Sequence, residues 1–486
     1  MKRIGHIIDG EEVDSVSGKR FITINPATEE SLAEVADGED EDVSRAVKSA
    51  RRAFDEGPWG RLAPWERGTL LGRVAEIIRR KNDDLALMDA LDCGKPIKDN
   101  KYGDVPLCAR IFDYYAGAPD KVRGAVIPSE YHFYNYSIRE PYGVVAGIVP
   151  WNYPLLNACM KLAPALAAGN TAVLKMADQT PLSTVELGRI CLEAGVPPGV
   201  VNVVNGGAAT GAALARHPLI DKISFTGSTE VGKLILHAAA ERVLPVTLEL
   251  GGKSPSIVFA DADQDQALSG VLFSAFFNAG QICTSGSRLL IEESVADGFL
   301  SKLSQKAAAL RIGDPTSEDT DLGPLVDRAQ LERVNEYIRV GQTEGAKLFL
   351  SSNGQAVDRG FYVAPTIFTE ASPEMRIAQE EIFGPVLTVL TFRDESEAIA
   401  LANGVAYGLA ASLWTNNLNR AFRMARAVQA GMIWTNTVEY WEPSVPFGGH
   451  KQSGLGEDFG LETFLSYTQN KSVFINLSGG KMEWGG

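Results

Sequence analysis

The spacing of apolar and polar residues predicts alternating strands and helices through the middle of the chain. Short apolar runs at 142–149 and 170–176 flank residues 152–169, whose apolar spacing and closing glycine are typical of a helix. The alternation continues to a strand at 221–227 and a helix that begins near Val231. This order predicts an α/β fold, in which helices cover both faces of a parallel sheet and ligands bind at the carboxyl ends of the strands.

A second set of similar elements follows residue 250. A helical pattern at 263–280, a strand at 287–294 and an amphipathic helix at 295–310 predict a second α/β domain. Residues 119–141 and 467–477 alternate apolar and polar positions without a helix beside them, which indicates extended strands outside both domains. Because such strands need partners for their backbone groups, we expect them to pair with each other in a neighbouring subunit.

Composition and charge narrow the class of protein. A chain of 486 residues is longer than a single hydrophobic core usually supports, so two or more domains are expected. The net charge of −15 argues against a nucleic-acid binder and against binding to an anionic membrane surface. The N-terminal residues lack the apolar core of a signal peptide, and no apolar run is long enough to span a membrane. We expect a cytoplasmic protein.

The five cysteines are scattered along the chain without paired spacing. This arrangement predicts neither a disulfide framework nor a zinc site, and we expect no bound metal. In a reducing compartment most of them are expected to be small buried apolar residues. One of them remains a candidate nucleophile.

The stretch FTGSTEVGKL at 225–234 follows a strand and opens a helix, as a phosphate-binding loop does. It fits the pattern G-x-x-x-x-G-K-[ST] up to the last position, where Leu234 replaces the hydroxyl that would hold Mg²⁺. A nucleotide hydrolase is therefore a disfavoured alternative. A glycine turn at a helix N-terminus can still bind a phosphate without a metal.

Several motifs together resemble the NAD(P)-dependent aldehyde dehydrogenase superfamily. FNAGQICTSGSR around Cys283 and TLELGGKSP from residue 247 are similar to the signature pair of that superfamily. PWNYP, VLKMADQTPLS, FTGSTEVG, EEIFGPV and PFGGHKQSGLG resemble its other recurrent blocks, in the same order and at compatible spacing. The resemblance covers essentially the whole chain. It implies a Rossmann-like coenzyme domain (1–118 and 142–251), an α/β catalytic domain (252–466) and a small extended β oligomerisation arm (119–141 and 467–486).

The resemblance assigns three catalytic residues, and each role suits the chemistry of its side chain. Cys283 matches the nucleophile, because a thiolate can add to an aldehyde carbon and form a thiohemiacetal. Glu249 matches the general base that takes a proton from the thiol or from the hydrolytic water. Asn152 matches the donor that stabilises the oxyanion, together with the backbone N–H of Cys283.

The resemblance also implies NAD as the cofactor. Lys175 would bind the adenosine ribose, and Asp178 stands where NAD-preferring members carry Glu. A carboxylate there repels a 2′-phosphate, so NADP is possible but less favoured. The expected cofactor-binding residues are Trp151, Lys175, Asp178, Gly227, Ser228, Val231, Leu234, Leu250, Glu381 and Phe383.

The implied reaction is oxidation of a small-molecule aldehyde to its acid, in which NAD binds first and Glu249 activates the hydrolytic water. Relatives that transfer the acyl group to coenzyme A typically lack this Glu, so a CoA-acylating semialdehyde dehydrogenase is the main alternative. A non-catalytic structural relative is a third class. We expect a homodimer or homotetramer.

The identity of the aldehyde stays open at this point. The aromatic faces of Tyr153 and Trp441, with the charge of Glu439, would suit an amino or trimethylammonio aldehyde, but they would serve an aryl aldehyde equally well. The residues expected around the substrate are Leu107, Tyr153, Met160, Phe277, Ile282, Thr284, Glu439, Trp441 and Phe447.

Overall fold

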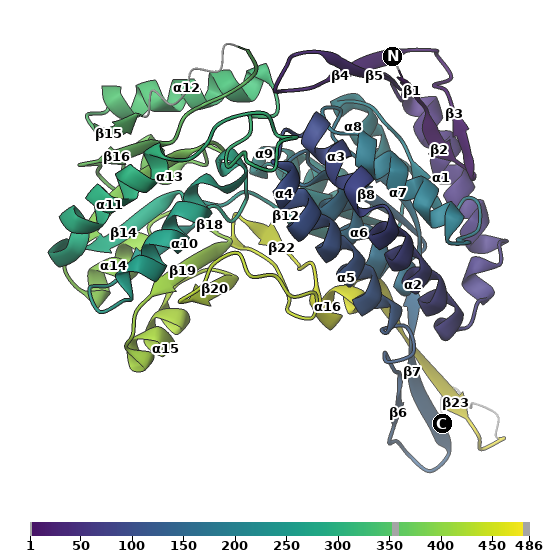
Figure 1. Cartoon of the computed structure of the whole chain (residues 1–486). Helices are drawn as coiled ribbons and strands as arrows, with labels where there is room; N and C mark the ends of the chain where they lie inside the picture. Colours follow the sequence, from purple (N-terminus) through teal and green to yellow (C-terminus); the bar gives the residue numbers. More distant parts are fainter. Residues whose placement is uncertain (1, 352–358, 480–486) are drawn as a thin grey trace.

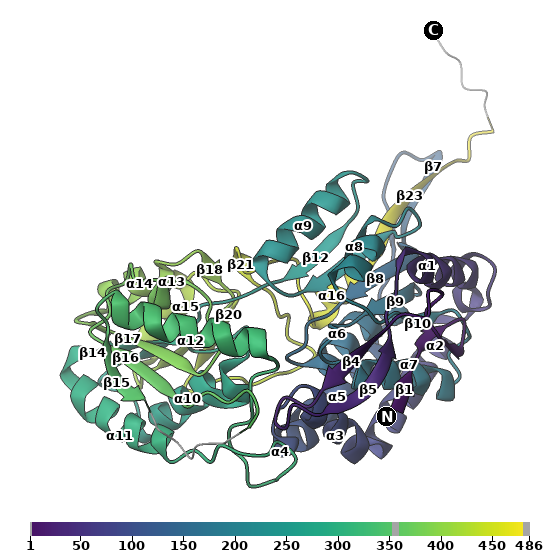
Figure 2. The same cartoon turned by 90° about the horizontal axis from the view of Figure 1, so that it is seen from above.

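The computed structural model describes residues 2–351 and 359–479, so the last part of the predicted arm, 480–486, lies outside the described residues. Two α/β lobes lie side by side, and a narrow β arm projects from one of them (Figures 1 and 2). The predicted α/β fold class is confirmed. In both described ranges, every helix is too short or too polar to cross a membrane.

The first lobe is built on a sheet of order β22-β12-β11-β8-β9-β10-β2-β3. Five of its strands run parallel to one another at its centre. They are almost entirely buried, as expected for strands that are covered on both faces. The strands are β2 (His6–Ile8), β3 (Glu11–Val13), β8 (Val144–Ile148), β9 (Thr171–Lys175), β10 (Val201–Val203), β11 (Lys222–Thr226), β12 (Val246–Glu249) and β22 (Gly454–Leu455).

Helices cover both faces of this sheet, as the alternation predicts. One face packs against α6 and α7, with α2, α3 and α5 behind them, and the other packs against α1, α8 and α9. The helix predicted near Val231 begins two residues earlier, because Ser228 caps its N-terminus. The helices are α1 (Asp40–Asp55), α2 (Pro64–Arg80), α3 (Asn82–Asp92), α5 (Val105–Ala116), α6 (Pro154–Ala167), α7 (Leu182–Glu193), α8 (Ala208–Arg216) and α9 (Thr229–Ala240).

The second lobe is built on a sheet of order β15-β16-β17-β14-β13-β19-β20, parallel apart from the edge strand β15. Helices α10, α11 and α12 pack on one face, and α14 and α15 pack on the other. The strands are β13 (Pro255–Val258), β14 (Arg288–Glu292), β15 (Lys347–Ser351), β16 (Thr366–Thr369), β17 (Val386–Phe392), β19 (Ala410–Trp414) and β20 (Met432–Thr435). The helices are α10 (Gln264–Phe276), α11 (Ala296–Ala308), α12 (Arg328–Thr343), α13 (Arg376–Gln379), α14 (Glu395–Asn403) and α15 (Leu418–Ala427).

The chain returns from the second lobe to the first near its C-terminus. Strand β22 pairs with β12, where Gly454 lies opposite Glu249. Helix α16 (Gly460–Ser466) then packs against α6. Residues 454–466 therefore join the first lobe, although they fall in the range predicted for the catalytic domain. The division into coenzyme, catalytic and arm domains stays a prediction.

The projecting arm is a three-stranded antiparallel sheet of β6 (Ala125–Ile127), β7 (Phe133–Pro141) and β23 (Thr468–Asn476). The two extended segments thus pair with each other within one chain, and not between neighbouring subunits as we expected. Large apolar side chains on the arm remain exposed, among them Val126 at 65% and Phe474 at 72%. Contact of this arm with a second copy of the chain stays a prediction.

At the N-terminus a small sheet of β1 (Lys2–Ile4), β5 (Ser31–Ala36) and β4 (Arg20–Ile24) lies at the top of the molecule in Figure 1. Backbone atoms of this region reach the second lobe, where the Phe361 N–H donates to the carbonyl oxygen of Pro26 at 3.0 Å. A two-stranded ladder of β18 (Tyr407–Gly408) and β21 (His450–Lys451) completes the second lobe. Both features tie together segments that are far apart in the sequence.

Arg288 holds the junction between the two lobes. It is 2% exposed at the start of β14, and its Nε donates to the carbonyl oxygen of Lys253 in the connection between β12 and β13. Its two terminal nitrogens donate to the carbonyl oxygens of Leu401 and Ala402 near the end of α14. The guanidinium group therefore satisfies three buried backbone acceptors at once, which few other side chains can do.

Replacing Arg288 with methionine should destabilise the protein strongly. The substitution keeps the apolar volume but leaves the three carbonyl groups without donors, which should cost roughly 3 kcal/mol or more of the free energy of unfolding. Urea unfolding followed by tryptophan fluorescence measures the loss. The matched control is Arg393→Met, because Arg393 is exposed and its ion pair within the described residues is with Glu397, so it should lose less than about 1 kcal/mol. Equal losses in both variants would contradict the assigned role.

Candidate active site

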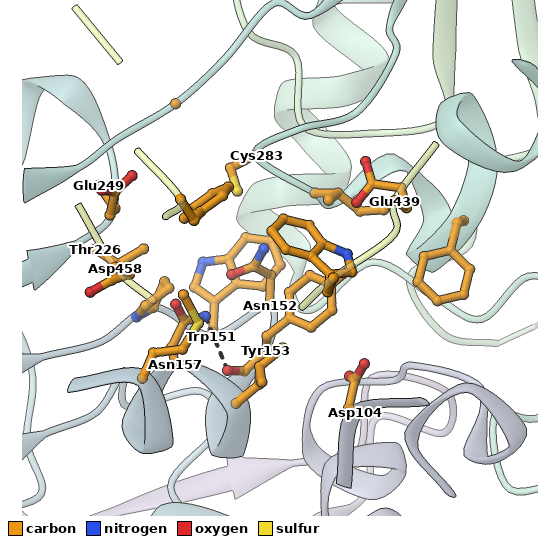
Figure 3. A pocket seen from close by; sticks show the side chains of 18 of the residues that line it. Asp104, Trp151, Asn152, Tyr153, Asn157, Thr226, Glu249, Cys283, Glu439 and Asp458 are labelled. Carbon is orange, nitrogen blue, oxygen red and sulfur yellow. Dashed lines mark hydrogen bonds between the residues drawn. The ribbon is translucent and has the colours of Figure 1, made fainter. Parts of the chain in front are cut away.

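A cavity of about 650 Å³ lies where the two lobes meet. From the first lobe it receives Asn152, which follows β8, and Thr226 and Glu249, which are the last residues of β11 and β12. From the second lobe it receives Cys283 and Glu439. Figure 3 shows Cys283 between the carboxyl groups of Glu249 and Glu439, with the Asn152 side chain below it. The cavity therefore opens at the carboxyl ends of parallel strands, where ligands bind in open α/β sheets.

A strained loop holds Cys283. Helix α10 ends in a 3-10 turn, η3 (Phe277–Gly280), in which Asn278, Ala279 and Gly280 all have positive φ. A Cβ atom at Gly280 would lie 2.2 Å from the carbonyl oxygen of Gly384, so the close approach requires glycine. Left-handed backbone at non-glycine residues costs free energy and is found mainly where the surrounding structure enforces it for function. The loop thus directs Cys283 into the cavity.

The Asn152 side chain is fixed beside the nucleophile. Asn152 is 4% exposed, and its Nδ2 donates to the carbonyl oxygen of Gln281 at 2.9 Å. Its own carbonyl oxygen accepts a hydrogen bond from Asn278 Nδ2 at 3.2 Å. Because the amide nitrogen has two hydrogens, one is left for an oxygen that gains negative charge next to Cys283.

Burial and nearby negative charge both act on the thiol. Burial raises the pKa of Cys283 above its usual range, and the carboxylates of Glu439, Glu381 and Glu249 raise it further. A thiol in these surroundings stays protonated near neutral pH. If Cys283 is to act as a nucleophile, as the sequence predicts, a base must therefore take its proton.

Glu249 is a suitable base. It is 2% exposed, and within the described residues neither carboxylate oxygen has a hydrogen-bond partner. Burial raises the pKa of this carboxyl well above its usual range, and the charge of Asp458 raises it further, whereas Lys161 lowers it. Asp458 and Lys161 are themselves buried and form an ion pair of 2.5 Å. A carboxyl with a raised pKa is a stronger proton acceptor once it is ionised.

Lys175 is the last residue of β9 and Asp178 follows shortly after it, and both lie next to α8. The ideal Cβ positions of Gly211 and Gly207 are within 4 Å of the side chains of Lys175 and Asp178, respectively. Burial lowers the pKa of Lys175 to about 8, although Asp178 and Asp37 counter this effect. Because Gly207 and Gly211 have no side chains, space remains beside the partly desolvated amine of Lys175 and the exposed carboxylate of Asp178. Two ribose hydroxyls would require such space.

The N-terminus of α9 borders the cavity, whereas Lys175 and Asp178 are not among the residues that line it. Gly227 and Ser228 line the cavity, and Ser228 Oγ accepts the Val231 N–H as the helix cap. Val231 and Leu234 are exposed, at 42% and 66%. Leu234 therefore presents an apolar surface at the position where a nucleotide hydrolase needs a metal-binding hydroxyl. This geometry fits a planar ring on the helix surface and a phosphate at the helix N-terminus.

Glu381 and Phe383 lie between these groups and Cys283. Glu381 Oε1 accepts the Gly252 N–H at 3.0 Å, and burial raises the pKa of Glu381 to about 7. Phe383 packs edge-to-face against Trp151, with ring centroids 5.2 Å apart. Leu250, Glu381, Phe383 and Trp151 all line the cavity, as the sequence predicts.

The residues predicted around the substrate form the other end of the cavity, apart from one. Thr284 is 2% exposed and lies behind the wall, where its hydroxyl is close to Glu439. The predicted residues that do line the cavity are Leu107, Tyr153, Met160, Phe277, Ile282, Glu439, Trp441 and Phe447.

Sequence reasoning missed much of one wall. The wall comes from α4 (Ile97–Asp99), one turn of π-helix η2 (Asn100–Asp104) and the start of α5. A π-turn inside a helix is rare and occurs mainly at functional sites. The residues of this wall that line the cavity include Asp99, Tyr102, Asp104 and Arg110, together with the predicted Leu107.

A buried lysine stands behind this wall. Lys95 is 1% exposed and forms an ion pair with Asp104. Its ammonium group also lies 3.8 Å from the centroid of the Tyr153 ring and 4.8 Å from that of Phe277. Of the two rings expected to receive a cationic substrate, Tyr153 therefore already faces a cation of the protein.

Comparison with known proteins identifies the family. Residues 13–473 match the model of the aldehyde dehydrogenase family. The chain is 46% identical to aldehyde dehydrogenase family 2 member B4, mitochondrial, from Arabidopsis thaliana, over 97% of this chain and 88% of that protein. It is 44% identical to a mitochondrial benzaldehyde dehydrogenase from Antirrhinum majus, over the same shares.

A solved structure of an aldehyde dehydrogenase is also similar to this chain over nearly its whole length. An indole-3-acetaldehyde dehydrogenase in complex with NAD+ has a TM-score of 0.96 and 44% sequence identity, over 98% of this chain and 97% of that one. The chain therefore belongs to the aldehyde dehydrogenase family. It is an aldehyde-oxidising enzyme, as the sequence motifs predict.

Replacing Asp458 with asparagine should lower the pKa of Glu249. The substitution removes the charge that raises this pKa and leaves Lys161, which lowers it. Because the base must be ionised, the acid limb of the kcat profile should move to lower pH, by roughly one unit. Glu457→Gln is the matched control, because the neighbouring Glu457 has a smaller effect on the same carboxyl. A shift to higher pH in Asp458→Asn would refute this account.

Proposed function

We propose that the protein oxidises an aldehyde to its carboxylic acid with NAD, through a thioester on Cys283 that Glu249-activated water hydrolyses. The observation that carries this proposal is the meeting of three side chains in one cavity: a thiol, an unpartnered buried carboxyl and an oriented amide. A nucleophile, a base and an oxyanion donor are what acyl chemistry at an aldehyde carbon needs.

The residues beside the cavity fit NAD. Lys175 and Asp178 would hold the adenosine ribose, the N-terminus of α9 with Ser228 would hold the pyrophosphate, and Glu381 the nicotinamide ribose. The space that Gly207 and Gly211 leave beside Lys175 supports this assignment, and so does the NAD+ complex of the similar indole-3-acetaldehyde dehydrogenase. Asp178 favours NAD over NADP by charge repulsion. Bound NAD supplies a hydride acceptor.

The chain's own residues carry the remaining steps. Glu249 takes the thiol proton as Cys283 adds to the aldehyde carbon, so the negative charge moves from a buried carboxylate to the developing oxyanion. The Asn152 amide and the Cys283 backbone N–H donate to that oxyanion. After hydride loss, Glu249 must release the thiol proton to solvent before it can take a proton from the water that attacks the thioester. The protonated Glu249 then returns this second proton to the departing Cys283 thiolate, so the acid leaves and the thiol is restored.

The environment of Glu249 favours water over coenzyme A as the acyl acceptor. Its two free oxygens face the cavity from the end of β12, where they can accept a proton from a water molecule beside Cys283. Coenzyme A as acceptor would not require such a base at this position. Hydrolysis to the free acid is therefore the reaction that we propose.

An aryl aldehyde is the substrate class that the cavity fits best. Phe273 and Phe277 stack with centroids 4.5 Å apart, and Trp441 packs edge-to-face on Phe447 at 5.0 Å. These rings line the cavity and suit another planar ring. The relatives named for benzaldehyde and indole-3-acetaldehyde support the same class. The ammonium group of Lys95 behind Tyr153 argues against amino and trimethylammonio aldehydes.

The variant Cys283→Ala tests the nucleophile. It should abolish NADH formation with benzaldehyde, because no other group can form the thiohemiacetal, while NAD binding measured by calorimetry stays within a few-fold of wild type. Cys191→Ala is the control, since Cys191 is buried in α7 away from the cavity. Turnover by Cys283→Ala would refute the assignment.

The variant Glu249→Gln separates hydrolysis from transfer to coenzyme A. The amide cannot activate water, so a rapid-mixing experiment with benzaldehyde and NAD should show slowed acyl formation or a single burst of NADH, followed by steady turnover at least 10²-fold below wild type. Adding coenzyme A to the wild-type enzyme should leave the product as free benzoic acid. Formation of benzoyl-CoA would instead support the CoA-acylating alternative.

A further inference from the structure

Glu439 is a buried carboxyl in the cavity to which the proposed reaction gives no role. It lies on the loop that follows β20, on the opposite side of Cys283 from Glu249 (Figure 3). Its Oε1 is shielded from solvent and, within the described residues, has no hydrogen-bond partner. An unpaired buried acceptor is costly unless a ligand or water satisfies it, so its position requires an explanation.

The backbone around Glu439 holds this carboxyl in place. Glu439 has a φ of +52°, which is strained for a residue with a side chain. The Trp434 indole N–H donates to the carbonyl oxygen of Tyr440 at 3.1 Å, and the Trp434 ring packs edge-to-face on Trp441. The strained backbone at Glu439 is therefore held by these contacts, and it directs the Glu439 side chain into the substrate end of the cavity.

The facing wall carries two carboxyls, Asp99 and Asp104, and the carboxyl of Asp104 is already satisfied. Asp104 forms its ion pair with Lys95, and Lys95 also lies against the rings of Tyr153 and Phe277. Within the described residues, Glu439 Oε1 therefore remains available as an acceptor at the aromatic end of the cavity, whereas Asp104 does not. Burial also raises the pKa of Glu439 to about 7, although the nearby Thr284 hydroxyl and Trp441 indole lower it, so it is a weak partner for a cation near neutral pH.

We propose that Glu439 determines specificity by accepting a hydrogen bond from a neutral donor, a hydroxyl or ring N–H, on an aryl aldehyde. The inference rests on the proposed function and narrows its substrate class. The ring of the substrate would lie among Phe277, Trp441 and Phe447, with its aldehyde carbon at Cys283 and its donor directed to Glu439. A substrate without the donor leaves the carboxyl unpaired, which is how a site built for a hydroxyl rejects an apolar isostere.

Isosteric substrate pairs test this role. The ratio of kcat/KM for 4-(hydroxymethyl)benzaldehyde over 4-ethylbenzaldehyde compares a donor with an apolar group of similar shape, and the 3-substituted pair covers the other ring position. The wild-type enzyme should prefer the hydroxymethyl aldehyde of at least one pair by about tenfold or more. Glu439→Leu should lose this preference, and Glu439→Gln should keep part of it because its amide oxygen still accepts.

Asp104→Asn is the matched variant on the facing wall. It should keep most of the preference, because the Asp104 carboxyl is already paired with Lys95. Loss of the preference in Asp104→Asn but not in Glu439→Leu would overturn the inference, and so would a wild-type ratio near one for both pairs. Faster turnover of betaine aldehyde than of every aryl aldehyde would overturn it as well. Absence of NADH with all the aldehydes would contradict the proposed function itself.

Discussion

The short connection between β12 and β13 is the constraint on which the site depends. Three contacts hold it: the Leu250 N–H donates to Ser453, the Gly252 N–H donates to Glu381, and Arg288 donates to the carbonyl oxygen of Lys253. Glu249 is the last residue before this connection. A Cβ atom at Gly252 would lie 2.4 Å from the carbonyl oxygen of Cys283, so Cys283 packs directly on the connection. Glu249 and Cys283 come from different lobes, and this contact constrains their separation.

Burial in the cavity also changes the pKa values of its ionisable groups. Burial raises the pKa of Cys283, of Glu249 and, to about 7, of Glu381 and Glu439. Each ionised member raises the pKa of Cys283 further, so the cavity resists holding several negative charges at once. A reaction that passes one negative charge between the carboxylate, the thiolate and the oxyanion suits such a cavity. Creating a new charge pair in the same place would cost far more, since little water is present to solvate it.

Periodicity and motifs were sufficient for the fold class and the enzyme family, because buried parallel strands and glycine turns leave strong local patterns. The sequence could not predict strand β22, since two residues, Gly454 and Leu455, carry no period and their pairing depends on the distant β12. It also missed Lys95 and the wall from Asp99 to Arg110. Lys95 is buried behind this wall, the wall includes a π-turn, and nothing local in the sequence marks that turn. The roles of the site residues, apart from their positions, stay predictions that experiments can test.

The charges at the two ends of the cavity also determine which ligand each end favours. One end has the N-terminus of α9, which attracts phosphate groups. The other end has the carboxyls of Asp99, Asp104 and Glu439. Within the described residues, Asp104 alone of these three forms an ion pair with a buried cation, Lys95. An anionic dinucleotide is therefore favoured at the first end and repelled from the second, which is left for a neutral aldehyde. The carboxylate product would form among acidic side chains, so the same charges that exclude phosphate at this end would favour release of the acid.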